Sequence, residues 1–157
     1  MRALSLMFRA ADDDLVVGLA SGAPGGDVIF HEACREQGIS SWVALPMPKD
    51  DYVARAFGDL DSWRSRFLSS AGHGKVLELS DRPGLPRWLD DTQTECDAWS
   101  RGNRWTISMA QSWGADETIV LVPWDEQDDG ALGRTTEFVR LARNTGLKVE
   151  IIPMPQG

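Results

Sequence analysis

The sequence predicts an α/β fold with an open, mainly parallel sheet and helices on both faces. Short apolar runs alternate with helical patterns along the chain, and turn-rich stretches separate them. Residues 118–124 (TIVLVPW) form a continuous run rich in β-branched residues, which is typical of a strand buried on both sides. Since the chain has only 157 residues, we expect residues 1–157 to form a single domain.

In the first half, residues 15–20 (LVVGLA) predict the first clear strand. Apolar residues recur at helical spacing over 27–37, and Gly38 follows at the expected end of that helix. Residues 41–46 predict the next strand, and residues 50–71 predict one or two helices. The elements predicted for the second half are a strand at 75–79, a loop at 81–88, a helix at about 94–113, a strand at 118–124, a helix at 136–145 and a strand at 148–153.

Composition excludes several classes of partner. The chain carries 24 acidic and 16 basic residues, a formal net charge of −8. Duplex nucleic acid and anionic membranes need a basic face, so we expect neither as a partner. The N-terminal residues lack the apolar core of a signal peptide, and no run is long enough to span a membrane. We therefore expect a cytoplasmic protein.

Cysteine and histidine are too sparse to suggest a metal site. Cys34 and Cys96 are far apart in the sequence, and the only histidines are His31 and His73. We expect two small buried thiols, no metal site and no cofactor. His31 is interpreted as a surface residue.

The turn after the first clear strand is a candidate ligand site. In open parallel sheets the ligand crevice lies beyond the carboxyl ends of the strands, where the chain reverses its winding direction. Gly25 and Gly26 let the backbone approach a ligand closely, and the following helix points free N–H groups at that place. Asp27 suits ribose hydroxyls. Alternatively, the glycines only form a tight turn and Asp27 caps the helix.

Glu32 is a second carboxylate on the same predicted helix. It follows Asp27 by five residues, so the two side chains diverge around the helix and form no carboxylate pair. Between Phe30 and Ala33 it is either partly buried, with a raised pKa if no cation meets it, or an exposed surface acid.

A second glycine-containing turn follows the strand at 118–124. Asp125 comes just past the strand end, and Gly133 and Thr135 precede the next helix. This turn offers a second helix N-terminus and a hydroxyl to an anion, or only caps the helix. We expect both turns to lie at one sheet edge and to face a common hollow.

Asn103 is the candidate site residue on the long helix. It shares a helix face with Trp99, Thr106, Ala110 and Trp113. A buried amide must find hydrogen-bond partners, so Asn103 either bonds the backbone or contacts a ligand.

Taken in order, these motifs resemble the Rossmann-like domain of the SLOG superfamily (Smf/DprA and Lonely Guy proteins), in the branch attached to bacterial nucleotide cyclases and tetratricopeptide proteins. The resemblance rests on GLASGAPGGDVIFHEACREQGI, WVALPMPKDDYV, GNRW and VPWDEQDDGALGRTTEFVRLARNTGLKVEII. That branch opens with a strand before the stretch equivalent to residues 15–20. Here this strand is missing, truncated or supplied by residues 4–8 (LSLMF).

The resemblance implies a binding site for a nucleotide or nucleotide derivative. The residues implied are Gly25, Gly26, Asp27, Glu32, Asn103, Asp125, Gly133 and Thr135. The leading hypothesis is a sensor domain that binds a nucleotide-like small molecule and acts on a partner or fused effector. One alternative is a nucleotide N-glycosidase with Glu32 or Asp125 as its catalytic carboxylate. Another is a homodimerisation module without a ligand, which would use an unpaired sheet edge.

Overall fold

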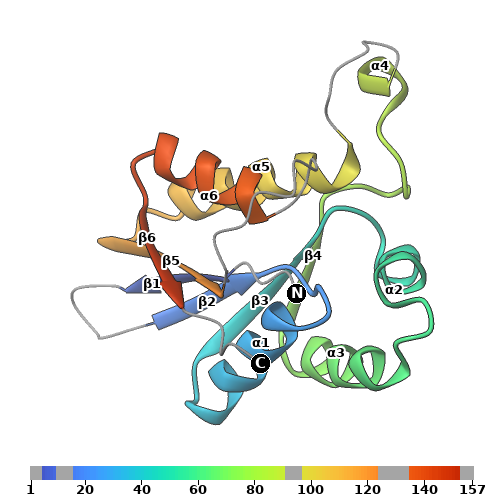
Figure 1. Ribbon diagram of the computed structural model, residues 1–157, viewed down its shortest axis with the longest axis horizontal. Coiled ribbons are helices and arrows are strands. Elements are labelled where there is room, and N and C mark those ends of the chain that lie inside the picture. Colours follow the sequence, from blue (N-terminus) through green and yellow to red (C-terminus); the bar gives the residue numbers. More distant parts are fainter. Residues whose placement is uncertain (1–4, 10–15, 91–96, 124–134, 153–157) are drawn as a thin grey trace.

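The fold was determined as a computed structural model, which describes residues 5–9, 16–90, 97–123 and 135–152. Figure 1 shows a single open sheet with helices packed on its two faces. The predicted fold class is therefore confirmed: the chain is α/β, with a Rossmann-like, mainly parallel sheet.

The secondary structure follows the predicted order. The strands are β1 (Ser5–Arg9), β2 (Val16–Ala20), β3 (Ser40–Leu45), β4 (Lys75–Glu78), β5 (Glu117–Pro123) and β6 (Lys148–Ile152). The helices are α1 (Gly26–Glu36), α2 (Lys49–Phe57), α3 (Asp61–His73), α4 (Arg87–Asp90), α5 (Ala98–Ser112) and α6 (Thr135–Asn144). Residues 50–71 thus belong to two helices, separated by Gly58 at a positive φ of 48°. The loop predicted for 81–88 ends in the short helix α4, which the proline-rich pattern did not suggest.

The strand order is β4-β3-β2-β1-β5-β6. β1 is antiparallel to both of its neighbours, β2 and β5. The remaining pairs, β2–β3, β3–β4 and β5–β6, are parallel, so every strand except β1 points the same way. Residues 4–8 were one predicted source of the opening strand, and the strand β1, at Ser5–Arg9, overlaps them. The centre of the sheet is therefore filled, and this removes the reason for proposing an incomplete sheet as a dimerisation edge.

Alternating side chains along the strands divide the core between the two faces. Leu19 and Ala44 pack with α5 and α6 on one face, around the buried ring of Phe138. Val43 and Leu45 point to the other face, where α1, α2 and α3 cover them. This two-residue period is what a sheet buried on both sides requires. Figure 1 shows α5 and α6 above the sheet and α1 below it.

The topology places a crevice at the carboxyl ends of the strands. From β2 the chain winds outward through β3 to β4, and it then returns by α5 to β5 on the far side of β1. The winding direction therefore reverses at β1, between β2 and β5. This is the place where open α/β sheets bind ligands.

Three further observations concern the described residues alone. Cys34 is buried, as predicted, while Cys96 lies outside the described residues. Within the described ranges there is no group of three or more potential metal-ligating side chains. None of the described helices has the length and apolar character that crossing a membrane demands.

Candidate functional site

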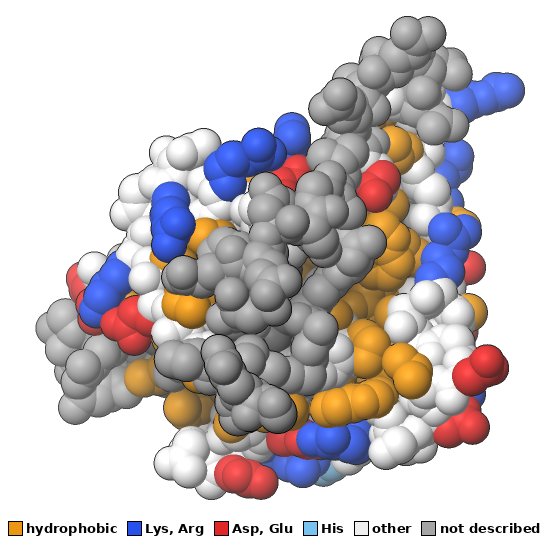
Figure 2. Space-filling view, viewed as in Figure 1, with side chains coloured by type: hydrophobic (Ala, Val, Ile, Leu, Met, Phe, Trp, Pro, Cys, Tyr) orange, Lys and Arg blue, Asp and Glu red, His pale blue; other side chains and the backbone are white. Residues whose placement is uncertain are grey.

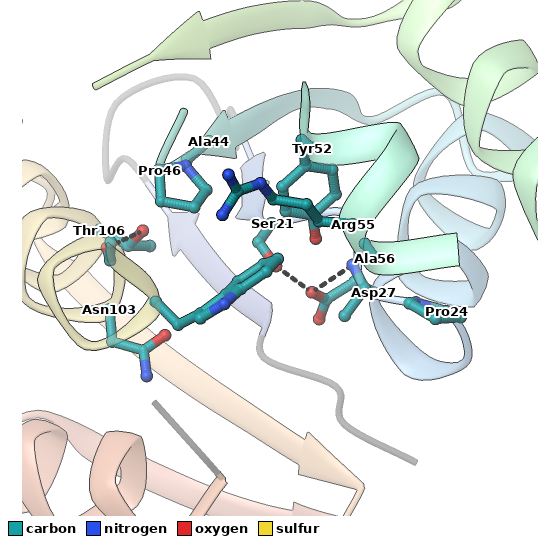
Figure 3. A pocket seen from close by; sticks show the side chains of 13 residues that line it. Ser21, Pro24, Asp27, Ala44, Pro46, Tyr52, Arg55, Ala56, Asn103 and Thr106 are labelled. Carbon is teal, nitrogen blue, oxygen red and sulfur yellow. Dashed lines mark hydrogen bonds between the residues drawn. The ribbon is translucent and has the colours of Figure 1, made fainter. Parts of the chain in front are cut away.

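A cavity of about 400 Å³ lies at the carboxyl ends of β2 and β3, between α1, α2 and α5. This volume falls in the range of small-molecule sites. Figure 3 shows its polar side chains arriving from three directions. They are Ser21, Asp27, Tyr52, Arg55, Asn103 and Thr106. The apolar part of the wall includes the side chains of Ala44, Pro46 and Trp99.

The β2–α1 turn forms one side of the cavity. Gly25 has φ 101° and ends the turn just before α1, in a region that favours glycine. Asp27, in the first turn of α1, is fully buried. Its Oδ2 accepts hydrogen bonds from Ser21 Oγ and, at 3.1 Å, from Ala23 N. The alternative that Asp27 is the helix cap is wrong: the N-cap is Gly25, and the Asp27 carboxylate holds the turn that precedes the helix.

His31 is hydrogen-bonded to this turn. The expectation that it lies on the surface is wrong. Its side chain is buried on α1, four residues after Asp27. Nε2 donates to the Ser21 carbonyl oxygen at 2.7 Å, since a carbonyl can only accept. Nδ1 lies 3.0 Å from Ser41 Oγ on β3 and, in the neutral ring, accepts from it. Burial lowers the pKa of His31 below its ordinary value of 6.5, against the hydrogen bonds to the backbone of Ser21 and Ala20, which raise it.

This lowered pKa predicts a pH-dependent stability. The unfolded chain takes up the His31 proton at a higher pH than the folded chain does. The stability that the neutral His31 ring contributes is therefore complete above the ordinary pKa of 6.5, and it is lost as the pH falls below that value. We expect the free energy of unfolding, measured by urea titration, to decline between neutral and mildly acidic pH.

The matched control uses the other histidine. His31→Gln removes this part of the pH dependence, whereas His73→Gln, at an exposed position, retains it. A His31→Gln protein with the same pH dependence as the wild type would contradict the assignment.

Helix α2 supplies the second side of the cavity. The Tyr52 hydroxyl accepts a hydrogen bond of 3.2 Å from Gly22 N, which ties α2 to the β2–α1 turn. Arg55 follows one turn later, and its guanidinium lies over the cavity in Figure 3. Arg55 is exposed and has no ion pair with any described residue. The cavity therefore has at its rim a cation that forms no ion pair with the described residues.

Helix α5 supplies the third side and carries Asn103, a predicted ligand residue. Asp97 caps this helix by accepting from Ser100 N at 2.7 Å. Asn103 and Trp99, one turn apart, both line the cavity. The Asn103 Nδ2 atom is buried and has no hydrogen-bond partner among the described residues. Such a donor is costly to leave unsatisfied, so it is a natural contact for a ligand oxygen or nitrogen.

Glu32 does not line the cavity. Its carboxylate accepts two hydrogen bonds from Arg66 on α3, the Nε bond at 2.8 Å. The hydrogen bond from Arg66 lowers the pKa of Glu32, against partial burial, which raises it. The sequence left open whether a cation meets Glu32; one does, and the carboxylate serves to join α1 to α3.

The second predicted turn is described only at its end. Asp125 and Gly133 lie outside the described residues. Thr135 is buried as the first residue of α6 and is not among the residues that line the cavity. That the two turns face a common hollow thus stays a prediction. Of the two turns, the structure places the β2–α1 turn at a cavity.

Sequence reasoning missed several polar contributors. The sequence indicates only that Tyr52 and Arg55 lie in a helix. No local pattern shows that α2 brings these two side chains to the cavity. A signal for His31 did exist: it stands at i+4 from Asp27, the spacing that places two side chains on one helix face. Glu137 of α6 is also buried and accepts a 2.6 Å hydrogen bond from Ser100 Oγ, but it does not line the cavity.

The cavity is mixed in character, with apolar walls and a few convergent polar groups. Figure 2 shows hydrophobic side chains gathered on this face, with Lys and Arg side chains along its border. Such a site suits a small molecule that has both a flat apolar part and charged or hydroxylated parts.

Comparison of the chain with protein-family models, with curated proteins and with solved structures found no match.

Proposed function

We propose that this domain binds a nucleotide or nucleotide derivative in the cavity between α1, α2 and α5, and that binding is sensed by a partner or fused effector. The observation that carries the proposal is Asn103, which lines the cavity and whose buried Nδ2 atom lacks a hydrogen-bond partner among the described residues. The resemblance to SLOG motifs points to the same class of ligand.

The other walls of the cavity fit the parts of a nucleotide. Arg55 offers a planar guanidinium to a phosphate group. Trp99 is in ring contact with Tyr52, at a centroid distance of 5.5 Å, and provides an aromatic surface for a base. Asp27 is an acceptor placed close to the backbone, as ribose hydroxyls require.

A thermal-shift screen tests this proposal. The probes are mononucleotides, cyclic dinucleotides and ADP-ribose, each with its uncharged nucleoside as a control. A ligand at a hundredfold excess over its Kd stabilises the fold by about 2.7 kcal/mol, which is readily measured as a rise in Tm. No rise in Tm with any probe at millimolar concentration would contradict the proposal.

The Asn103 donor is tested by Asn103→Asp, which replaces the amide NH₂ by an oxygen. We expect binding of adenosine monophosphate (AMP), measured by calorimetry, to weaken by about tenfold or more, because a donor is lost and a negative charge is added. Asn144→Asp, an exposed position at the end of α6, makes the same chemical change and should leave the affinity unaltered. Equal affinities for both variants would remove Asn103 from the site.

Arg55 is tested with two probes that differ only in the phosphate. We expect Arg55→Ala to weaken AMP binding by about three- to tenfold, a modest loss because the side chain is exposed, and to leave adenosine binding unchanged. Arg143→Ala, at an exposed position on α6, is the control. An equal loss for AMP and adenosine would show that Arg55 does not contact the phosphate.

The N-glycosidase alternative gains no support from Glu32, whose carboxylate is engaged by Arg66. Its other candidate, Asp125, lies outside the described residues. Chromatography for free base after incubation with AMP decides between binding and turnover. Base release that survives Glu32→Gln but is lost in Asp125→Asn would favour the enzyme.

A further inference from the structure

A chain of hydrogen bonds, centred on the buried His31 ring, runs from β3 through α1 to the cavity. It begins at Ser41 on β3, passes through the His31 ring and reaches the backbone carbonyl of Ser21. The Ser21 hydroxyl then donates to Asp27, which lines the cavity. His31 does not line the cavity itself, so any effect it has on a ligand passes through Ser21 and Asp27.

We propose that His31 is the positioning residue of the ligand site, and that it fixes the Asp27 carboxylate by holding Ser21 through an Nε2–H donor. The effect of this positioning on ligand binding rests on the proposed function. The positioning itself is a property of the protein without ligand and is tested separately.

The geometry supports this role in two ways. Both ring nitrogens are engaged, so the ring has one orientation and, when neutral, one tautomer. Ser21, whose carbonyl oxygen accepts from His31, directly follows β2. The chain turns there, so that Ser21 Oγ and Ala23 N both donate to the same Asp27 oxygen. A loosened Ser21 carbonyl would let both donors drift away from the carboxylate.

The lowered pKa of His31 fits the same role. Burial keeps the ring neutral, and a neutral ring in this tautomer is both the donor to Ser21 and the acceptor from Ser41. The ring also has an edge-on contact with Phe30, at 5.6 Å between centroids, which limits its rotation.

Three variants separate positioning from general stability. His31→Gln keeps an Nε2–H donor at a similar reach, and His31→Leu removes both hydrogen bonds while filling a similar volume. Ser41→Ala removes only the partner of Nδ1. If His31→Leu fails to fold, His31→Gln and Ser41→Ala still test the proposal.

The ligand-free measurement is NMR spectroscopy on labelled protein. In the wild type, and in Ser41→Ala, we expect the His31 ring to carry its proton on Nε2. We expect the Asp27 carboxyl ¹³C and Ala23 amide resonances to move in His31→Leu and to stay near their wild-type positions in His31→Gln. A proton on Nδ1, or unmoved Asp27 and Ala23 resonances in folded His31→Leu, would overturn the proposal.

The second readout is AMP binding by calorimetry. We expect His31→Leu to bind about tenfold or more weakly, and His31→Gln to stay within about twofold of the wild type. Wild-type affinity in His31→Leu would overturn the positioning role. If the wild type binds no nucleotide, the proposed function fails, while the NMR result still decides whether His31 positions Asp27.

Discussion

Asp27→Ala is expected to cost both stability and ligand binding. The substitution leaves Ser21 Oγ and Ala23 N without their acceptor in a partly buried turn. A donor left without an acceptor in a buried environment destabilises a protein by about 1–3 kcal/mol, so we expect urea titration to show a loss within this range. Because Asp27 also lines the cavity, AMP binding should become undetectable by calorimetry in the fraction that stays folded.

Two other variants make this prediction specific. Asp27→Asn keeps an acceptor for both donors, so it should be more stable than Asp27→Ala. Asp59→Ala removes an exposed carboxylate in the turn after α2 and should change the stability by no more than about 0.5 kcal/mol. An Asp27→Ala protein as stable as Asp59→Ala would show that the buried carboxylate does not hold the turn.

Gly22→Ala is expected to be the most disruptive of the single-methyl changes near the site. A Cβ at this position would stand 2.1 Å from Phe67 Cε2 and 2.6 Å from Cδ2, far inside contact distance. The Phe67 ring is fully buried and packs against Tyr52 and Phe57, so it has little room to move. Overpacking of this kind destabilises by about 1–3 kcal/mol. Because Gly22 N also donates to the Tyr52 hydroxyl, the cavity should be distorted as well.

Gly72→Ala is the matched control for this change. It adds the same methyl group in the last turn of α3, where a Cβ would meet nothing within 4 Å. Alanine favours the helix over glycine by up to about 1 kcal/mol, so this variant should be as stable as the wild type or more stable. Thermal unfolding of the two alanine variants side by side checks both expectations. If Gly22→Ala matched Gly72→Ala, the packing of Phe67 on the turn would be refuted.

Much of the fold is predictable because its signals are local. The continuous apolar run that became β5 and the helical spacing that became α1 each appear within a dozen residues. Glycines after α1, α5 and α6 also mark the helix ends correctly: Gly38, Gly114 and Gly146 all have positive φ. The antiparallel direction of β1 could not be predicted, because pairing between strands far apart in sequence leaves no local pattern.

The site is only partly predictable, for the same reason. Asp27 and Asn103, two of the predicted ligand residues, line the cavity, and their contact with a ligand stays a prediction. Their candidacy came from local patterns, because one follows a strand and the other lies on an apolar helix face. The role of Glu32 was not predictable from such patterns, since it depends on Arg66, which lies 34 residues away in the sequence. Arg55 was missed because only the packing of α2 brings its guanidinium over the sheet edge.

The most direct test of the central claim is an NMR titration of the ¹⁵N-labelled protein with AMP. Binding in the cavity predicts that the largest amide shifts fall on residues 21–27 of the β2–α1 turn, on Arg55 and on Asn103, with the Asn103 side-chain amide among them. Affinities as weak as about 1 mM are still visible in such a titration. Shifts confined to the far ends of the strands, or no shifts at all, would contradict a nucleotide site between α1, α2 and α5.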